Sequence, residues 1–226
     1  MSLPILITLE CLVAHLVECR KTRGEHMNEI EAIRSQYKPE WIVTLFVGES
    51  APVSGAFFYK DDTALAHHMR KAMEAAGFDC SGDFLSTFKS LGWYLDDLVL
   101  EPINDLSPKQ RKARHRECQE SLRQRIASCR PRAVVSLLLS IRDIVETAAA
   151  RAAPDARTHA VHFAGFGQQN VFRAEMAEIL PKLPTLPQIR ATARQAADQL
   201  TKLRDSITAP PLGWEEIKKM RDEGRH

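Results

Sequence analysis

Four short apolar segments alternate with stretches of helical periodicity, and this order constrains the fold more than any other feature of the chain. The segments are residues 41–47, 93–99, 133–138 and 158–163. They read as strands, and the residues between successive segments read as helices. Strands that alternate with helices form a parallel sheet covered on both faces, because the crossovers are right-handed. The sequence therefore predicts an α/β three-layer sandwich with a central four-stranded parallel sheet.

Helical segments precede, separate and follow these strands. One or two helices are expected within residues 3–36, and Ser107 followed by Pro108 marks the start of a long helix that ends near residue 129. After the last strand, a helix is expected to reach residue 180, followed by two more at 186–206 and 214–222. We therefore predict an α/β domain with a helical N-terminal lead, residues 1–182. A helical C-terminal extension, residues 183–226, is expected to pack on the same domain.

Charge and cysteine content limit the partners. The net charge is only +2 for 226 residues, so any contact with nucleic acid must come from local patches. The first 17 residues fit neither a secretory signal nor a membrane span, and the five cysteines match no zinc ribbon or redox pair. These features predict a cytoplasmic protein without membrane contact, metal or cofactor. The oligomeric state is not determined by the sequence, although a monomer is slightly favoured.

The segment after the first strand carries side chains suited to a planar ring. The strand stops at Gly48 and is followed by Glu49, Ser50 and, further on, the three consecutive aromatic residues 57–59. Open α/β sheets bind ligands outside the carboxyl ends of their strands, where this loop is expected to lie. The residues predict a pocket for a planar base. The alternative is a tight turn whose aromatic side chains pack into the core.

Three motifs resemble those of the uracil-DNA glycosylase superfamily, over about residues 41–180. Gly48-Glu-Ser-Ala-Pro52 is similar to the Gly-Glu-Ala-Pro-Gly loop of its thermostable branch. Asp97, in Tyr94-Leu-Asp-Asp-Leu-Val99, falls where the family ends a strand with a base-reading Asn. His162-Phe-Ala-Gly-Phe-Gly167 follows the last strand, where the family carries His-Pro-Ser and a DNA-wedging loop. The chain lacks that Pro-Ser and the four cysteines of the thermostable branch, so we expect no iron–sulfur cluster.

The resemblance implies a DNA glycosylase that flips a base out of DNA and hydrolyses its N-glycosidic bond. It implies that Glu49 stabilises positive charge on the sugar or orients water, and that His162 hydrogen-bonds the departing base. The implied base-binding residues are Ser50, Phe57, Phe58 and Asp97, and the implied DNA-binding residues are Ser54, Gly55, Gly165, Phe166, Gly167, Gln168 and Gln169. Among the latter, Phe166 is the candidate wedge between base steps. Structural roles for Glu49, His162 and Phe166 are the alternatives.

Asp97 indicates which base is bound. An Asn side chain both donates and accepts, whereas an ionised carboxylate only accepts. Asp97 therefore favours the exocyclic amine of a cytosine-like or modified base over uracil, as in DNA repair or defence against phage DNA. A protonated Asp97 would restore the donor, but only with deep burial. Strand phase decides whether Asp96 or Asp97 faces the pocket.

Other readings of the sequence stay open. The helix from Ser107 is rich in Lys and Arg, which suits a DNA backbone but also an ordinary solvated face. Lys60, beside the aromatic loop, can in principle add a lyase step. The rival functions are a non-catalytic nucleic-acid or nucleotide-binding protein with the glycosylase fold, and an enzyme acting on a small nucleotide.

Overall fold

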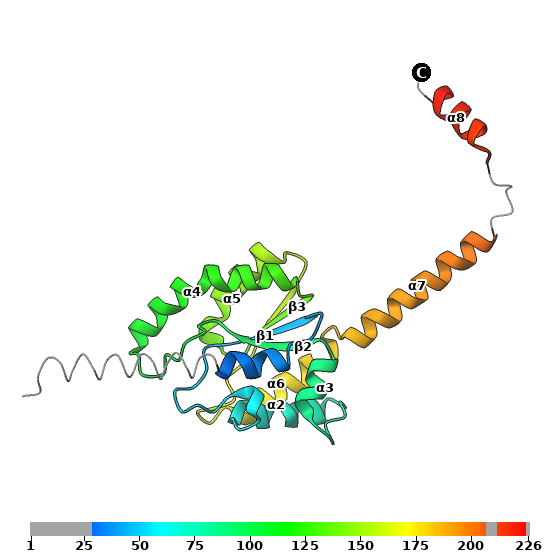
Figure 1. Cartoon of the computed structure of the whole chain (residues 1–226). Helices are drawn as coiled ribbons and strands as arrows, with labels where there is room; N and C mark the ends of the chain where they lie inside the picture. The colour runs from blue at the N-terminus through cyan, green and yellow to red at the C-terminus, as the bar shows by residue number, and fades with distance from the viewer. Residues whose placement is uncertain (1–28, 207–211, 225–226) are drawn as a thin grey trace, which may run out of the picture. The chain divides into compact units, whose positions relative to one another are not determined.

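Four parallel strands form the central sheet of the computed structural model, which describes residues 29–206 and 212–224 (Figure 1). The strands are β1 (Thr44–Gly48), β2 (Trp93–Asp97), β3 (Ala133–Ser136) and β4 (Arg157–Ala160), in the spatial order β2-β1-β3-β4. All three pairings are parallel. The predicted α/β fold with a four-stranded parallel sheet is confirmed. Residues 1–28, which hold most of the predicted N-terminal lead, lie outside the described residues.

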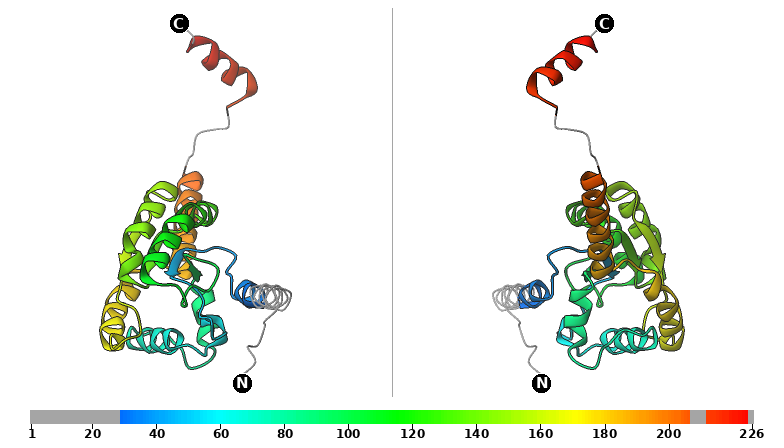
Figure 2. Two further views of the ribbon diagram at one scale, coloured as in Figure 1. Left: turned by 90° about the vertical axis from the view of Figure 1, so that its left-hand side faces the viewer. Right: turned by 90° about the vertical axis from the view of Figure 1, so that its right-hand side faces the viewer.

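Helices cover both faces of the sheet. On one face lie α2 (Ala64–Ala75), α3 (Phe84–Ser90) and α6 (Gln169–Ile179), and on the other lie α4 (Pro108–Cys129) and α5 (Arg142–Ala152) (Figure 1). α2 and α6 pack side by side (Figure 2). Short 3-10 helices occur at Phe58–Lys60, Leu139–Ile141 and Leu180–Lys182. The central strand β1 is buried along its whole length, because its neighbours and both helical layers cover it.

Local signals in the sequence set the helix boundaries. The predicted start at Ser107 and Pro108 is confirmed, and the Gln110 side chain accepts a hydrogen bond from Ser107 N at 3.0 Å. Thr63 and Asp83 cap α2 and α3 by accepting backbone N–H bonds in the first turn. The last strand ends at Ala160, earlier than predicted, because its ladder stops with Val161 N donating to Ser136 O. His162 and Phe163 therefore lie in a loop.

The chain divides into two compact units, Met1–Pro187 and Gln188–His226. The first unit extends past the predicted boundary at 182 because residues 183–186 bind the sheet. Pro184 O accepts hydrogen bonds from Trp93 Nε1 and Thr44 Oγ1, each 3.0 Å long, and Leu186 N donates to Leu91 O. The second unit holds α8 (Trp214–Glu223) and most of α7 (Leu186–Ser206). No helix among the described residues is long and apolar enough to cross a bilayer.

Candidate functional site

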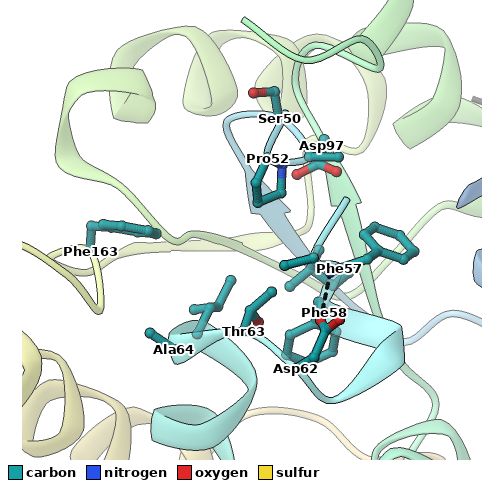
Figure 3. A pocket seen from close by; sticks show the side chains of 13 residues that line it. Ser50, Pro52, Phe57, Phe58, Asp62, Thr63, Ala64, Asp97 and Phe163 are labelled. Atoms are coloured by element: carbon teal, nitrogen blue, oxygen red, sulfur yellow. Dashed lines mark hydrogen bonds between the residues drawn. The ribbon is translucent and has the colours of Figure 1, made fainter. Parts of the chain in front are cut away.

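A cavity of about 320 Å³ lies at the carboxyl edge of the sheet (Figure 3). Its walls come from the loop after β1, the end of β2, the start of α2 and the loop after β4. The lining residues are Ser50, Ala51, Pro52, Ala56, Phe57, Phe58, Asp62, Thr63, Ala64, Leu65, Leu95, Asp97 and Phe163. Three segments that are far apart in the sequence therefore meet here, because parallel strands end at the same edge.

Aromatic side chains form two opposite sides of the cavity. Phe57 and Phe58 are 2% and 3% exposed, and their rings pack edge-on against Tyr59 with centroids 5.6 and 5.1 Å away. Phe163 lies across the cavity from Phe57 (Figure 3). Asp62 Oδ1 fixes the backbone by accepting a hydrogen bond from Phe57 N at 2.7 Å. Phe57 and Phe58 thus pack in the core and also line the cavity. The predicted pocket and the alternative of core packing therefore both apply to this segment.

Asp97 supplies a carboxylate to the cavity wall, and Arg34 holds it. Arg34 Nη2 donates to Asp97 Oδ2 at 2.8 Å, and its Nη1 donates to Asp96 Oδ1 at 2.5 Å. The Arg34 side chain is 2% exposed, and its guanidinium carbon lies 5.3 Å from the Phe57 ring centroid. Arg125 completes the cluster by binding Asp96 Oδ2 and the Asp97 carbonyl, each at 2.6 Å. Of the two candidate aspartates, Asp97 is the one that lines the cavity.

The second oxygen of Asp97 lies against Gly48. A Cβ on Gly48 would come within 2.5 Å of Asp97 Oδ1, so only glycine leaves room for the carboxylate here. Within residues 29–206 and 212–224, no hydrogen bond reaches this oxygen. Burial raises the pKa of Asp97, and the charge of Arg34 opposes that shift. Arg34 thus binds Oδ2 of the carboxylate, while Oδ1 packs against Gly48.

Glu49 does not line the cavity, although its neighbour Ser50 does. Its Oε1 lies 2.9 Å from His115 Nε2, and its Oε2 forms an ion pair with Arg111. Both partners lie on α4, four residues apart, and therefore on one helix face. His115 is a buried site residue that we did not predict. The i, i+4 spacing shows that Arg111 and His115 share a face but does not identify the acid they bind.

The pairing of Glu49 predicts a pH-dependent contribution to stability. Burial raises the pKa of Glu49, but hydrogen bonds from His115 and Arg111 lower it more, so the net shift is downward. The ionised form therefore stabilises the fold above the unfolded-state pKa of about 4.3, and the contribution is lost as the pH falls through the lowered folded-state pKa. Glu49→Gln should lower the free energy of unfolding at pH 7 by about 1–3 kcal/mol.

Urea unfolding of wild type and Glu49→Gln across a pH series measures this effect. The difference between the two proteins should be full at pH 7 and shrink below about pH 4. Glu120→Gln, which removes an exposed pair with Arg123, is the matched control and should change little at any pH. A constant difference down to low pH would contradict the assignment of the shift to the Glu49 carboxylate.

His162 also lies outside the cavity lining, whereas the next residue, Phe163, is part of it. The His162 ring is held by Glu175 of α6, with His162 Nδ1 2.7 Å from Glu175 Oε1. The structure therefore brings together Ser50, Phe57, Phe58 and Asp97 but does not bring Glu49 or His162 into the same cavity wall. Each predicted catalytic residue instead directly precedes a lining residue in the chain, Ser50 or Phe163.

Phe166 is 95% exposed in the loop between β4 and α6. Its backbone φ of 51° and that of Gly167, 81°, are both in the left-handed region, which is strained for a bulky side chain. The Phe166 ring centroid lies 6.2 Å from that of Phe163. A Cβ on Gly165 would meet the Phe163 ring at 2.7 Å, so Gly165 allows this close approach. The loop thus presents an aromatic ring beside the cavity.

The other predicted DNA-binding residues lie in loops or at the start of α6. Gln169 begins α6 and Gln168 precedes it, with Gln168 N donating to Gly165 O at 2.9 Å. Ser54 and Gly55 lie in the loop after β1 but do not line the cavity. Lys60 binds Glu29 Oε1 at 2.9 Å and the Gly55 carbonyl at 3.4 Å, so its amine is engaged in contacts within the chain.

Ion pairs neutralise part of the basic α4. Arg111, Arg114, Arg123 and Arg125 bind Glu49, Glu101, Glu120 and Asp96, respectively. Lys109, Lys112 and Arg116 are exposed and form no ion pair among the described residues. Their i, i+3, i+7 spacing puts these three side chains on one face of the helix. The basic surface available to an anion on this helix is therefore limited to this face.

The three motifs of the sequence lie at or beside the cavity. Asp97 and the loops that follow β1 and β4 contribute to the cavity or lie at its edge. Neither a protein-family model nor a curated protein matches the chain.

Proposed function

We propose that the protein is a DNA glycosylase that binds one extruded base in the cavity and hydrolyses its N-glycosidic bond. The observation that carries this proposal is the exposed Phe166 ring beside Phe163, which lines the cavity. A bulky residue held on strained backbone favours a functional loop, and Phe166 is also almost fully exposed beside the cavity. Inserted between base steps, Phe166 would fill the space that a flipped base leaves in the duplex.

The cavity suits a flat ring that carries an amine. Phe57, Phe58 and Phe163 provide aromatic walls, and Asp97 Oδ1 provides an acceptor held in place by Arg34 through the other oxygen. Burial raises the pKa of Asp97, but Arg34 and Arg125 oppose that shift, so we take the bound form to be the carboxylate. An ionised carboxylate pairs with an exocyclic amine such as cytosine N4 and repels a carbonyl such as uracil O4. The proposed substrate is a cytosine-like or otherwise modified base, in DNA repair or defence against phage DNA.

The proposed reaction is a hydrolysis, and we assign the charged residues of α4 and of the loop after β1 to binding and positioning. Hydrolysis forms a bond from water oxygen to the anomeric carbon, and the electrons of the broken carbon–nitrogen bond leave with the base. Lys109, Lys112 and Arg116 are the cations of α4 available to bind phosphates. Glu49 is ion-paired with Arg111 and hydrogen-bonded to His115, so we assign it to anchoring the loop after β1 rather than to a step of the reaction.

Removing the proposed wedge should impair action on duplex DNA. Phe166→Ala is expected to lower kcat/KM on double-stranded substrate by about 5- to 150-fold, the equivalent of one base–aromatic stack of about 1–3 kcal/mol. Activity on single-stranded substrate should fall less, because no hole in a base stack needs to be filled. The measurement is abasic-site formation on paired single- and double-stranded DNAs that contain modified cytosines, cytosine, hypoxanthine, xanthine or uracil.

Trp41→Ala is the matched control, because Trp41 is also an exposed aromatic residue but precedes β1 and so lies at the opposite, amino edge of the sheet. Trp41→Ala should form abasic sites at the wild-type rate. Equal losses for Phe166→Ala on both strand forms would contradict the wedge role. Tight DNA binding without abasic sites on any substrate would favour the non-catalytic binding protein. That alternative is supported by the absence of Glu49 and His162 from the cavity lining.

A further inference from the structure

Glu175 binds His162 through both of its carboxylate oxygens. The backbone N–H of His162 donates to Oε2 at 2.8 Å, and ring Nδ1 lies 2.7 Å from Oε1. Glu175 lies in α6 between Phe172 and Met176, two core residues that fix the helix on the sheet. The carboxylate is therefore held by the fold, and the two contacts fix both the position and the orientation of the imidazole.

This geometry determines which nitrogen carries the proton. A carboxylate only accepts hydrogen bonds, and Oε2 already accepts one from a backbone amide. Nδ1 must therefore be the protonated nitrogen of a neutral ring, which leaves the lone pair on Nε2. We infer that Glu175 is a positioning residue that makes His162 Nε2 a proton acceptor, so that His162 acts as the general base that activates water.

The role of His162 as a general base rests on the proposed glycosylase function. The tautomer of its ring does not depend on that function. His162 precedes Phe163 of the cavity wall, and its side chain is 40% exposed, so the imidazole is in contact with solvent. In the reaction, water attacks the anomeric carbon and gives its proton to Nε2, while the electron pair of the glycosidic bond leaves with the base. A hydrogen bond from His162 to the departing base, as expected from the motif, would instead require a proton on Nε2.

Glu175→Gln should exchange the two tautomers. The backbone N–H of His162 still needs an acceptor, so the Gln oxygen is expected to take the place of Oε2. The Gln NH₂ group then faces Nδ1 and donates to it, which moves the ring proton to Nε2. With Nε2 protonated, His162 cannot act as the base, and the loss of a general base lowers kcat by about 10²–10⁴-fold. Glu175→Ala removes both contacts and should leave the ring free to adopt either tautomer.

Nitrogen-15 NMR of the full chain, labelled at histidine, tests the tautomer directly at a pH where the ring is neutral. We expect the Nδ1–H form in wild type, the Nε2–H form in Glu175→Gln and a mixture in Glu175→Ala. Glu178→Gln is the matched control, because Glu178 lies on the same helix but is exposed and binds Lys182. It should retain the wild-type spectrum. An Nε2–H ring in wild type would overturn the inference.

Single-turnover cleavage of DNA then tests whether His162 acts as the general base. The rate should fall in Glu175→Gln with little change in DNA affinity, while Glu178→Gln should match wild type. A wild-type rate and pH profile in Glu175→Gln, despite the exchanged tautomer, would overturn the role as general base. If the wild-type protein releases no base from any substrate, the proposed function and the general-base role are both wrong. The NMR spectra then still show whether Glu175 positions the ring of His162.

Discussion

Arg34→Met should lower the free energy of unfolding by about 3–5 kcal/mol, because removing one partner of a buried ion pair leaves the other charge uncompensated. Arg34 binds both Asp96 and Asp97, and all three side chains are less than a tenth exposed. Methionine fills much of the same volume, so the loss reflects charge more than a cavity. Equilibrium unfolding in urea, followed by fluorescence and circular dichroism, measures the effect.

A second variant separates the ion pair from general damage to the core. In Arg34→Met, Asp96 keeps its ion pair with Arg125, but the Asp97 side chain loses its bound cation. Arg34→Met combined with Asp97→Asn also removes the charge of Asp97 and should be more stable than the sum of the single changes predicts. Arg123→Met breaks an exposed pair with Glu120 and should leave stability almost unchanged. Strict additivity of Arg34→Met and Asp97→Asn would show that the two side chains do not interact energetically.

Asp97→Asn should shift the preference of the cavity from a base with an exocyclic amine, such as cytosine, towards a base with a carbonyl, such as uracil. Arg34 Nη2 donates to Oδ2, so the Asn oxygen is expected to stay on Arg34 and its NH₂ group to replace Oδ1. The group available to the ligand then changes from an acceptor to a donor. Discrimination between cytosine-like bases and uracil should shift by about 1–3 kcal/mol, or roughly 5- to 150-fold, in favour of uracil.

Competition between the two bases in otherwise identical oligonucleotides, scored by abasic-site formation, measures that shift. Asp62→Asn is the matched control, because Asp62 also lines the cavity but its Oδ1 accepts a hydrogen bond from Phe57 N. The Asn oxygen can keep that bond, so base preference should not change. An unchanged preference in Asp97→Asn would remove this side chain from base recognition.

The fold could be predicted from the sequence because its signals are local. Apolar runs identify the strands, and Ser107 with Pro108 marks the first turn of α4. The exact ends of the strands do not follow from the sequence, since the apolar pattern and some backbone hydrogen bonds continue past the last strand residue. Leu98 and Val99 still donate to the carbonyls of Gly48 and Glu49, although β2 ends at Asp97.

Contacts between distant residues could not be predicted in the same way. Arg34 and Asp97 are 63 positions apart, and Glu49 and His115 are 66 apart, so no local pattern links the members of either pair. The resemblance points to Asp97 at the end of its strand, but strand phase leaves Asp96 as the alternative, and only the structure shows that Asp97 lines the cavity. Glu175 could not be found, because nothing in a helical sequence shows which loop histidine its carboxylate meets.

Arg34 contacts two walls of the cavity at once, the carboxylate of Asp97 and the ring of Phe57. A change of residue at position 34 therefore alters both the hydrogen-bonding group and the stacking surface that a ligand meets. In evolution, position 97 would have to change before position 34, because losing the arginine first leaves two buried aspartates without their common cation. The order of substitutions, and not only their number, then limits how such a protein acquires a new substrate.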